Sequence, residues 1–334
     1  RAADQAFSTA YAFRRFLQKH LPSYIFEHPK AEPLKGLKIK RLNSLPKEIM
    51  KRWPPASPGL LEGDVGMLSS LPIDHNVGVT EVRGGPVHAQ RALKGFLEDR
   101  LPYYAESRNQ PEEEGTSGVS PYLHVGHISA CDIFHQIMEK ENWFFDSLSK
   151  TARGNRAGWW GMSQSSEAFL DQLITWRELG FNMCSQRKDY DRYESLPDWA
   201  LKTLTTHELD ERPSLYGLEP FEAAKTHDPL WNAAQRQLLR EGRIHNYLRM
   251  LWGKKILEWS PTPREALKIM IELNNKYALD GRDPNSYSGI FWVLGRYDRA
   301  WGPERPVFGK IRYMSSENTA RKFRVRNYIE KYVQ

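Results

Sequence analysis

The sequence has little cysteine, because Cys131 and Cys184 are the only two among its 334 residues. Two distant thiols are too few for a disulfide framework or a cysteine-based zinc site. No uninterrupted apolar run reaches the roughly 18 residues that a membrane-spanning helix requires. The start, RAADQAFSTAYAFRR, also lacks the apolar core of a secretory signal. We therefore expect an intracellular protein of the cytoplasm or nucleus, in a reducing setting and without a membrane partner.

Several common motifs of enzymes are also missing. The sequence contains no glycine-rich dinucleotide fingerprint, no phosphate-binding loop and no H-E-x-x-H pair. It contains no G-x-S-x-G nucleophile turn either. His124 and His127 are three residues apart but have no third ligand nearby in the sequence, so we expect no metal site.

Charge of both signs is present, with a formal net charge of +7 and a pI near 9.2. The basic residues concentrate in residues 34–52 and 321–331, and an acidic loop, SRNQPEEEGTSG, occupies residues 107–118. A moderately basic chain is compatible with a phosphate-bearing partner. Solubility alone explains such a charge about equally well.

The expected fold class is mainly α. Few segments alternate with period two, and no strand–helix–strand series occurs. Seven prolines between residues 28 and 74 predict an irregular connector with one short helix near residues 46–52. Further helices are expected over residues 7–27 (ended by Pro22, with a short second helix), 86–101 (ended by Pro102), from Ser129, and over 167–179, 228–242 and 243–260.

Tryptophan is concentrated between Asp228 and Trp301, which hold five of the eleven indoles. Asp228 and Pro229 are typical of a helix start, and Gly242 of its end. On the next helix Trp252 and Trp259 are seven residues apart and therefore share a face. Taken alone, this pattern favours buried core rings, since aromatic side chains dominate core energetics.

Seven segments together resemble one known family. They are Tyr104-x3-Arg108-x2-Pro111, TSGVSPYLH with Gly126 (116–126), FLDQLITWREL (169–179), KTHDPLWNAAQ (225–235), IHNYLRMLWGKKILEW (244–259), LDGRDPN (279–285) and FGKIRYMS (308–315). In this order they resemble the FAD-binding catalytic domain of the photolyase/cryptochrome family, in particular the class II cyclobutane pyrimidine dimer photolyases. The similarity runs from about Gly84 to the end of the chain.

The resemblance implies a domain organisation and a set of partners. Residues 1–80 would be a remnant of the family's N-terminal antenna domain plus a connector, and residues 81–334 an all-helical FAD-binding catalytic domain. The implied cofactor is FAD, reduced when active, with no antenna chromophore on this chain. The implied partner is UV-damaged DNA, bound through a basic face by a monomer.

The TSGVS segment suits a pyrophosphate, because small residues let backbone N–H groups approach phosphate oxygens and the hydroxyls add donors. A plain capped loop is the alternative. The resemblance implies FAD contacts at Tyr104, Thr116, Ser117, Gly118, Val119, Ser120, Arg177, Arg249, Asn274, Asp280 and Asn285. Asn274 would lie near the flavin N5, while Arg249 and Asp280 would balance an anionic reduced flavin. Asp280 is equally typical of a turn cap.

The resemblance also divides the tryptophans by role. Trp231, Trp252 and Trp259 match an electron relay to the flavin, while Trp301 remains a core ring. Trp176 and Trp292 match residues that stack on a flipped-out dimer, and Gln172 and Met250 match residues that touch it.

Gln172 departs from the family pattern, since dimer-splitting members carry a glutamate there. An amide can only hydrogen-bond a dimer radical anion, whereas a carboxyl group can share a proton with it. The (6-4) photolyases also place a glutamine here, but His245 fits the class II pattern rather than theirs. The implied function is light-driven electron donation from FADH⁻ to a cyclobutane pyrimidine dimer, by a carbon–carbon lyase. A (6-4) preference or a non-repairing, cryptochrome-like photoreceptor remains open, as do a slower dimer photolyase and an engineered substitution.

Overall fold

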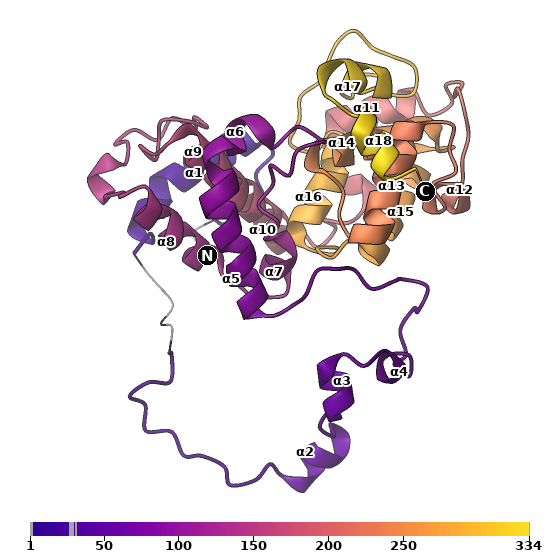
Figure 1. Cartoon of the computed structure of the whole chain (residues 1–334). Coiled ribbons are helices and arrows are strands. Elements are labelled where there is room, and N and C mark those ends of the chain that lie inside the picture. Colours follow the sequence, from indigo (N-terminus) through magenta and orange to yellow (C-terminus); the bar gives the residue numbers. More distant parts are fainter. Residues whose placement is uncertain (1–2, 27–29, 31, 334) are drawn as a thin grey trace. The chain divides into compact units, whose positions relative to one another are not determined.

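A computed structural model describes residues 3–26, 30 and 32–333 of the chain. The fold is mainly α, as predicted, and its strand-like pairings within that part are two isolated bridges, Thr9 with Tyr297 and Arg305 with Gly309. The contacts divide the chain into two units (Figure 1). The smaller unit is Glu27–Gly78, and the larger combines Arg1–Phe26 with Val79–Gln334.

The smaller unit holds three short helices, α2 (Lys47–Arg52), α3 (Pro58–Glu62) and α4 (Val65–Leu68). Two of them begin at side-chain caps, because Ser57 accepts from the N–H of Leu60 and Asp64 from that of Met67. The short helix predicted near residues 46–52 is confirmed as α2, but the prediction of a single helix is wrong, since α3 and α4 follow it. The side chains of this unit are mostly exposed, as expected of an irregular connector without its own core.

The larger unit begins with lobe A, which comprises α1 and the elements from α5 to α10 (Figure 1). Its helices are α1 (Ala10–His20), α5 (Pro86–Gly95), α6 (Tyr104–Ser107), α7 (Ser120–His124), α8 (Ala130–Lys140), α9 (Gln164–Leu170) and α10 (Arg177–Gln186). Two π-helical segments, η2 (Phe96–Arg100) and η5 (Asp171–Trp176), and three 3₁₀ turns, η1 (Leu21–Ser23), η3 (Leu101–Tyr103) and η4 (Phe145–Ser147), complete it.

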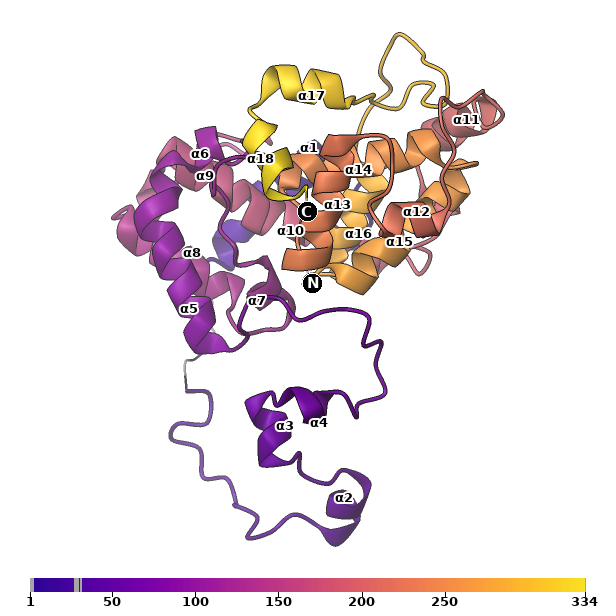
Figure 2. The same cartoon turned by 45° about the vertical axis from the view of Figure 1, so that its right-hand side comes forward.

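Lobe B follows, from η6 to α18, and its helices pack beside lobe A in both views (Figures 1 and 2). Its elements are η6 (Tyr193–Ser195), α11 (Asp198–Thr206), α12 (Leu218–Glu222), α13 (Pro229–Glu241), α14 (Asn246–Trp259), α15 (Pro263–Tyr277), α16 (Pro284–Val293), α17 (Ser316–Lys322) and α18 (Arg326–Lys331). Among the residues that the structure describes, no helix is long and apolar enough to cross a membrane.

Local signals predicted the ends of α13 and α14 well. The Asp228 carboxylate accepts the N–H of Trp231 at 2.9 Å, an interaction that stabilises a helix start by about 1 kcal/mol. Gly242 ends α13 with φ at 66°, a left-handed conformation that favours glycine. α14 then ends at Trp259, directly before Ser260 and Pro261.

Two predicted helices differ from the structure at their centres. The helix expected to end at Pro102 widens at Phe96 into the π-helical η2 and then tightens into η3. The helix expected over residues 167–179 is α9, η5 and α10 in series, from Gln164 to Gln186. Propensity and periodicity do not distinguish a π turn from an α turn, so packing decides it.

The two lobes have separate cores, with a small third cluster where α1, α10 and α16 meet. This cluster contains Ala10, Phe13, Leu179, Met183 and Tyr297. Gly180 on α10 lets the backbone of α16 approach closely, because a Cβ there would lie 2.7 Å from the carbonyl oxygen of Pro284. The close contact between α10 and α16 therefore determines how near lobes A and B lie to each other at these two helices.

Candidate functional site

The loop from Thr116 to Ser120 is a turn with a left-handed glycine and two exposed residues. Gly118 has φ at 71°, which a side chain would strain, and the Ser117 hydroxyl accepts the N–H of Val119 at 3.5 Å. Gly118 and Ser120 are exposed. Arg100 holds the loop from behind by donating to the carbonyl oxygen of Thr116 at 3.0 Å.

This loop meets lobe B at Asp280. The Ser120 hydroxyl donates to the Asp280 carboxylate, and an Arg249 Nη2 lies 3.7 Å from the other carboxylate oxygen. The Arg249 and Asp280 side chains are only 20% and 15% exposed, so their charges interact in a partly desolvated setting. Three predicted cofactor residues from distant segments are thus adjacent.

Asn274 extends the same cluster. Its amide donates to the Ser286 hydroxyl at 3.1 Å, and that hydroxyl donates to the Asp280 carbonyl oxygen, also at 3.1 Å. The turn cap considered for Asp280 belongs instead to Asp283, whose carboxylate accepts the N–H of Asn285 at 2.9 Å. The Asp280 carboxylate is therefore directed to Ser120 and Arg249, while the Asn285 side chain is exposed.

Tyr104 and Arg177 have other surroundings. Tyr104 is buried edge-to-face against Phe96 and Phe169, at centroid distances of 5.7 and 5.4 Å, and this burial raises the pKa of its phenol. Arg177 pairs with the neighbouring Glu178 at 3.0 Å rather than with the Asp280 cluster.

Trp231, Trp252 and Trp259 lie together in the core of lobe B and are almost fully buried. The rings of Trp231 and Trp259 have centroids 6.2 Å apart. The Trp231 indole donates to the Trp252 carbonyl oxygen at 3.0 Å, and the Trp252 indole donates to Gln235 at 2.8 Å. The core interpretation therefore holds for all three rings, and the electron relay remains a prediction.

The four residues matched to the lesion come from three elements. Trp176, at the end of η5, and Trp292, on α16, both pack on the small cluster between the lobes. Met250 on α14 faces α16, because a Cβ on Gly289 would meet its methyl group at 3.9 Å. Gln172 lies within η5 and is partly exposed.

Two features differ from the sequence-based picture of this region. Trp301, expected in the core, is partly exposed and lies against the guanidinium groups of Arg299 and Arg312, 4.7 and 5.0 Å from its centroid. Lys254, which drew no attention in the sequence, is fully buried with Nζ 5.1 Å from the Trp292 ring centroid. Burial lowers its pKa to about 7, and its Nζ donates to the Val293 carbonyl oxygen at 2.5 Å. Because α14 also carries Arg249, Lys255 and Glu258, nothing in the sequence distinguished Lys254 as the buried cation.

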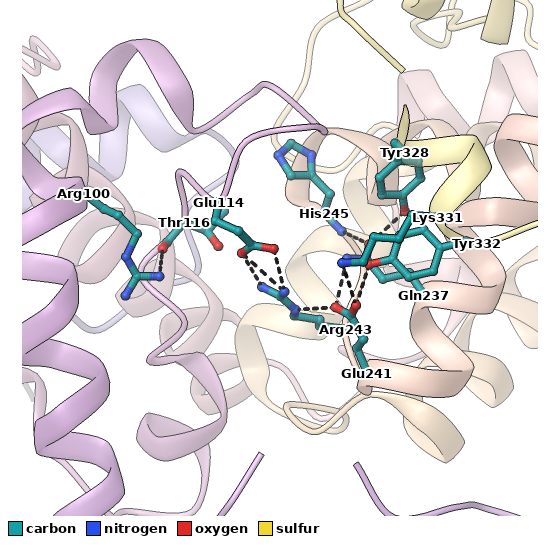
Figure 3. Close-up of polar contacts among 10 residues, drawn as sticks. All are labelled: Arg100, Glu114, Thr116, Gln237, Glu241, Arg243, His245, Tyr328, Lys331 and Tyr332. Atoms are coloured by element: carbon teal, nitrogen blue, oxygen red, sulfur yellow. Dashed lines mark hydrogen bonds and ion pairs between the residues drawn. The ribbon is translucent and has the colours of Figure 1, made fainter. Parts of the chain in front are cut away.

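The acidic loop and the basic C-terminal segment are paired with each other. Glu112 accepts from the backbone and side chain of Asn327 at 2.7 and 3.1 Å, and Glu113 pairs with Arg324. Glu114 pairs with Arg243 at 3.2 Å (Figure 3). The basic segment is therefore partly neutralised, and the acidic loop joins the Thr116 turn to lobe B.

Arg243 continues this network into α13 and α18 (Figure 3). It pairs with Glu241 at 3.0 Å, and Glu241 in turn receives Lys331 at 3.2 Å and the Tyr332 hydroxyl at 2.5 Å. A cavity of about 360 Å³ lies between the acidic loop and α18. None of its lining residues is a predicted cofactor contact, so this hollow is not the Asp280 cluster.

Among known protein families, no family model matches the chain. It is 39% identical over 268 residues to a protein of Potorous tridactylus, covering 80% of this chain and 47% of that one. It is 38% identical over 330 residues to a protein of Arabidopsis thaliana (96% and 60%), and 45% over 237 residues to one of Oryza sativa (70% and 43%). All three are named deoxyribodipyrimidine photo-lyase, and the chain spans about half the length of these relatives.

Two solved structures share the fold. A bacterial class III photolyase from Agrobacterium tumefaciens superposes with a TM-score of 0.55 at 19% identity, covering 75% of this chain and 45% of that one. A cryptochrome from Synechocystis superposes with a TM-score of 0.54 at 16% identity, covering 78% and 48%. At these identities the likeness concerns the fold alone.

Proposed function

We propose that the chain belongs to the photolyase/cryptochrome family and is the FAD-binding catalytic part of a light-driven DNA repair enzyme of class II. Its similarity to three proteins named deoxyribodipyrimidine photo-lyase supports this proposal. The observation that carries the proposal is the cluster of Ser120, Arg249, Asn274 and Asp280, drawn from three segments of the chain. We also propose that residues 81–334 form this catalytic part, and that residues 1–80 are a remnant of an N-terminal antenna domain plus a connector.

The residues of the cluster fit the proposed cofactor. Arg249 Nη2 lies 3.7 Å from the Asp280 carboxylate, too far for a hydrogen bond, so this nitrogen would be available to an anion. The Thr116–Ser120 turn offers exposed hydroxyl and backbone groups beside it, which suits a pyrophosphate. When bound, reduced FAD would supply, after absorbing near-UV or blue light, an electron that opens a cyclobutane pyrimidine dimer and then returns.

The protein's own groups would orient and shield the reacting partners. Arg249 and Asp280 would fix the charge around the flavin, and the buried Asn274 amide would present a hydrogen-bonding group to it. Trp176, Trp292 and Met250 would enclose the flipped-out bases, and Gln172 would hydrogen-bond them.

The test of this proposal is a repair assay on defined lesions. Purified protein loaded with reduced FAD is illuminated with oligonucleotides carrying one cyclobutane dimer or one (6-4) product. Loss of the cyclobutane lesion supports the proposal, whereas loss of neither lesion rules it out. Extraction of bound chromophores in the same experiment tests the expectation of FAD without an antenna chromophore, and gel filtration tests the expected monomer.

Gln172 supports a second candidate, a cryptochrome-like photoreceptor that uses the same cofactor without repair, and it leaves a (6-4) preference open. We predict that Gln172→Glu raises the rate of cyclobutane dimer repair by about tenfold, because a carboxyl group shares a proton with the reduced dimer whereas an amide does not.

The control is Gln164→Glu, an exposed glutamine at the start of α9 in the same helical run. Repair rates of parent, variant and control are compared on both lesions. An unchanged rate in Gln172→Glu would show that this position does not limit repair. A parent that repairs nothing while the variant repairs dimers would favour the photoreceptor.

A further inference from the structure

A buried ion pair joins α1 to the first residue of η5. The guanidinium of Arg14 binds the Asp171 carboxylate through two hydrogen bonds, Nε to Oδ1 at 2.7 Å and Nη2 to Oδ2 at 3.1 Å. The two side chains are only 6% and 10% exposed. A charge pair removed from water persists where its geometry is good and further hydrogen bonds satisfy it. The two hydrogen bonds therefore fix the orientation of the Arg14 guanidinium relative to the Asp171 carboxylate.

The rest of the same face of α1 is equally constrained. Arg14 Nη1 donates to the Gly154 carbonyl oxygen at 3.3 Å, and Gln18 both donates to Asn155 at 2.9 Å and accepts the Gly154 N–H at 2.7 Å. Gly154 has φ at 79°, and a Cβ there would lie 3.1 Å from the Tyr11 ring. α1 thus has one register against this loop.

The segment that α1 holds is η5, which carries two of the proposed lesion contacts. Asp171 begins η5, Gln172 follows it, and Trp176 ends it. A π-helical segment is uncommon and depends on tertiary contacts for its stability. α1 supplies these contacts at both ends of η5, because its Ala10 and Phe13 belong to the small cluster on which Trp176 packs.

We propose that Arg14 and Asp171 are positioning residues that set the orientation of Gln172 and Trp176 toward a flipped-out pyrimidine dimer of damaged DNA. This inference rests on the proposed function and deepens it, since it assigns lesion specificity to a contact outside the binding surface. Neither residue touches the DNA. Their effect passes through the geometry of η5.

The test replaces both charged groups by apolar ones, Arg14→Met with Asp171→Leu, so that no unpaired buried charge remains. Affinity is measured for an oligonucleotide with one cyclobutane dimer and for the same oligonucleotide without damage. We expect undamaged DNA to bind within about twofold of the parent and the preference for damaged DNA to fall about tenfold. The KM for repair rises correspondingly.

The matched control is Arg187→Met with Asp189→Leu, the same changes at a two-point ion pair near the end of α10 that is about 40% exposed. Its lesion preference should equal that of the parent. A double variant of Arg14 and Asp171 that folds, binds FAD and keeps the parent's preference overturns the inference.

A second variant covers the case in which the double variant does not fold. Arg14→Lys keeps the charge pair with Asp171 but not its two-point geometry, and we expect an intermediate loss of preference. Parental preference in this variant also overturns the inference. A parent protein without any preference for damaged DNA contradicts the proposed function itself, so the two failures are distinguishable.

Discussion

At the scale of single residues, His245 is a buried group whose charge affects the stability of the fold. It precedes α14, and its imidazole is buried beside the backbone of Arg108. Burial lowers the pKa of its imidazole to about 4, against the partly opposing effect of Glu114. At pH values between about 4 and 6.5, the His245 imidazole is therefore mostly neutral in the folded protein and mostly protonated in the unfolded chain.

This difference in protonation predicts a pH dependence of stability. Between the ordinary pKa of 6.5 and the folded value of about 4, the unfolded chain binds more protons, so the free energy of unfolding falls as the pH drops through this range. His245→Leu removes the titrating group and should reduce the loss between pH 7 and pH 4 by up to about 3 kcal/mol.

Urea unfolding at a series of pH values measures this effect. His88→Leu, at a partly exposed histidine on α5, controls for the loss of an imidazole elsewhere in the same unit. The assignment is wrong if the parent and His245→Leu lose stability in parallel as the pH falls.

At the scale of elements, the acidic loop connects the proposed cofactor turn of lobe A to lobe B. Glu112, Glu113 and Glu114 contact Asn327, Arg324 and Arg243 respectively. These contacts are largely exposed, and each such pair stabilises by about 0–1 kcal/mol. Because all three contacts act on one short loop, we expect them together to hold the adjacent Thr116–Ser120 turn in place.

We therefore predict that the triple change Glu112→Gln, Glu113→Gln and Glu114→Gln speeds FAD dissociation by about fivefold to tenfold. The rate is measured from the rise in flavin fluorescence after dilution. Salt at about 1 M, where the Debye length is about 3 Å, should produce a similar increase in the parent.

The control for this triple variant is Glu48→Gln, Glu62→Gln and Glu81→Gln, which makes the same change of charge at exposed glutamates that are not part of the loop. This control should release FAD at the parental rate. Equal rates in parent and loop variant would show that the acidic loop does not retain the cofactor.

At the scale of the whole molecule, the three buried indoles of lobe B form the path proposed for electrons. Trp252 is linked to Trp231 through its carbonyl oxygen, and Trp231 lies against Trp259. All three are also core residues, so folding and electron transfer have to be measured separately.

We predict that Trp252→Phe lowers the rate of light-driven flavin reduction by at least tenfold, because phenylalanine is much harder to oxidise than tryptophan, while FAD remains bound. Flavin absorbance during illumination measures the rate. Trp143→Phe, a buried tryptophan in the core of lobe A, is the control and should photoreduce normally. Normal photoreduction in Trp252→Phe would leave that ring a core residue only.

What the sequence by itself determined is local. The mainly α fold, the start of α13 at Asp228, its end at Gly242 and the short helix α2 all follow from capping residues and periodicity, which act within one or two turns. The family resemblance likewise depends on short motifs, and several of its residues, Ser120, Arg249, Asn274 and Asp280, prove to be neighbours. The motifs by themselves do not predict which residues of different segments come into contact.

Only the tertiary structure decided the remaining features. The π turn of η5, the Arg14–Asp171 pair across 157 positions and the Glu113–Arg324 pair across 211 positions depend on segments that no local pattern relates. The burial of Lys254 and the partial exposure of Trp301 depend on the same packing. Caps and periodicity reflect interactions between near neighbours in the chain, whereas these contacts form only when the helices of lobes A and B pack together.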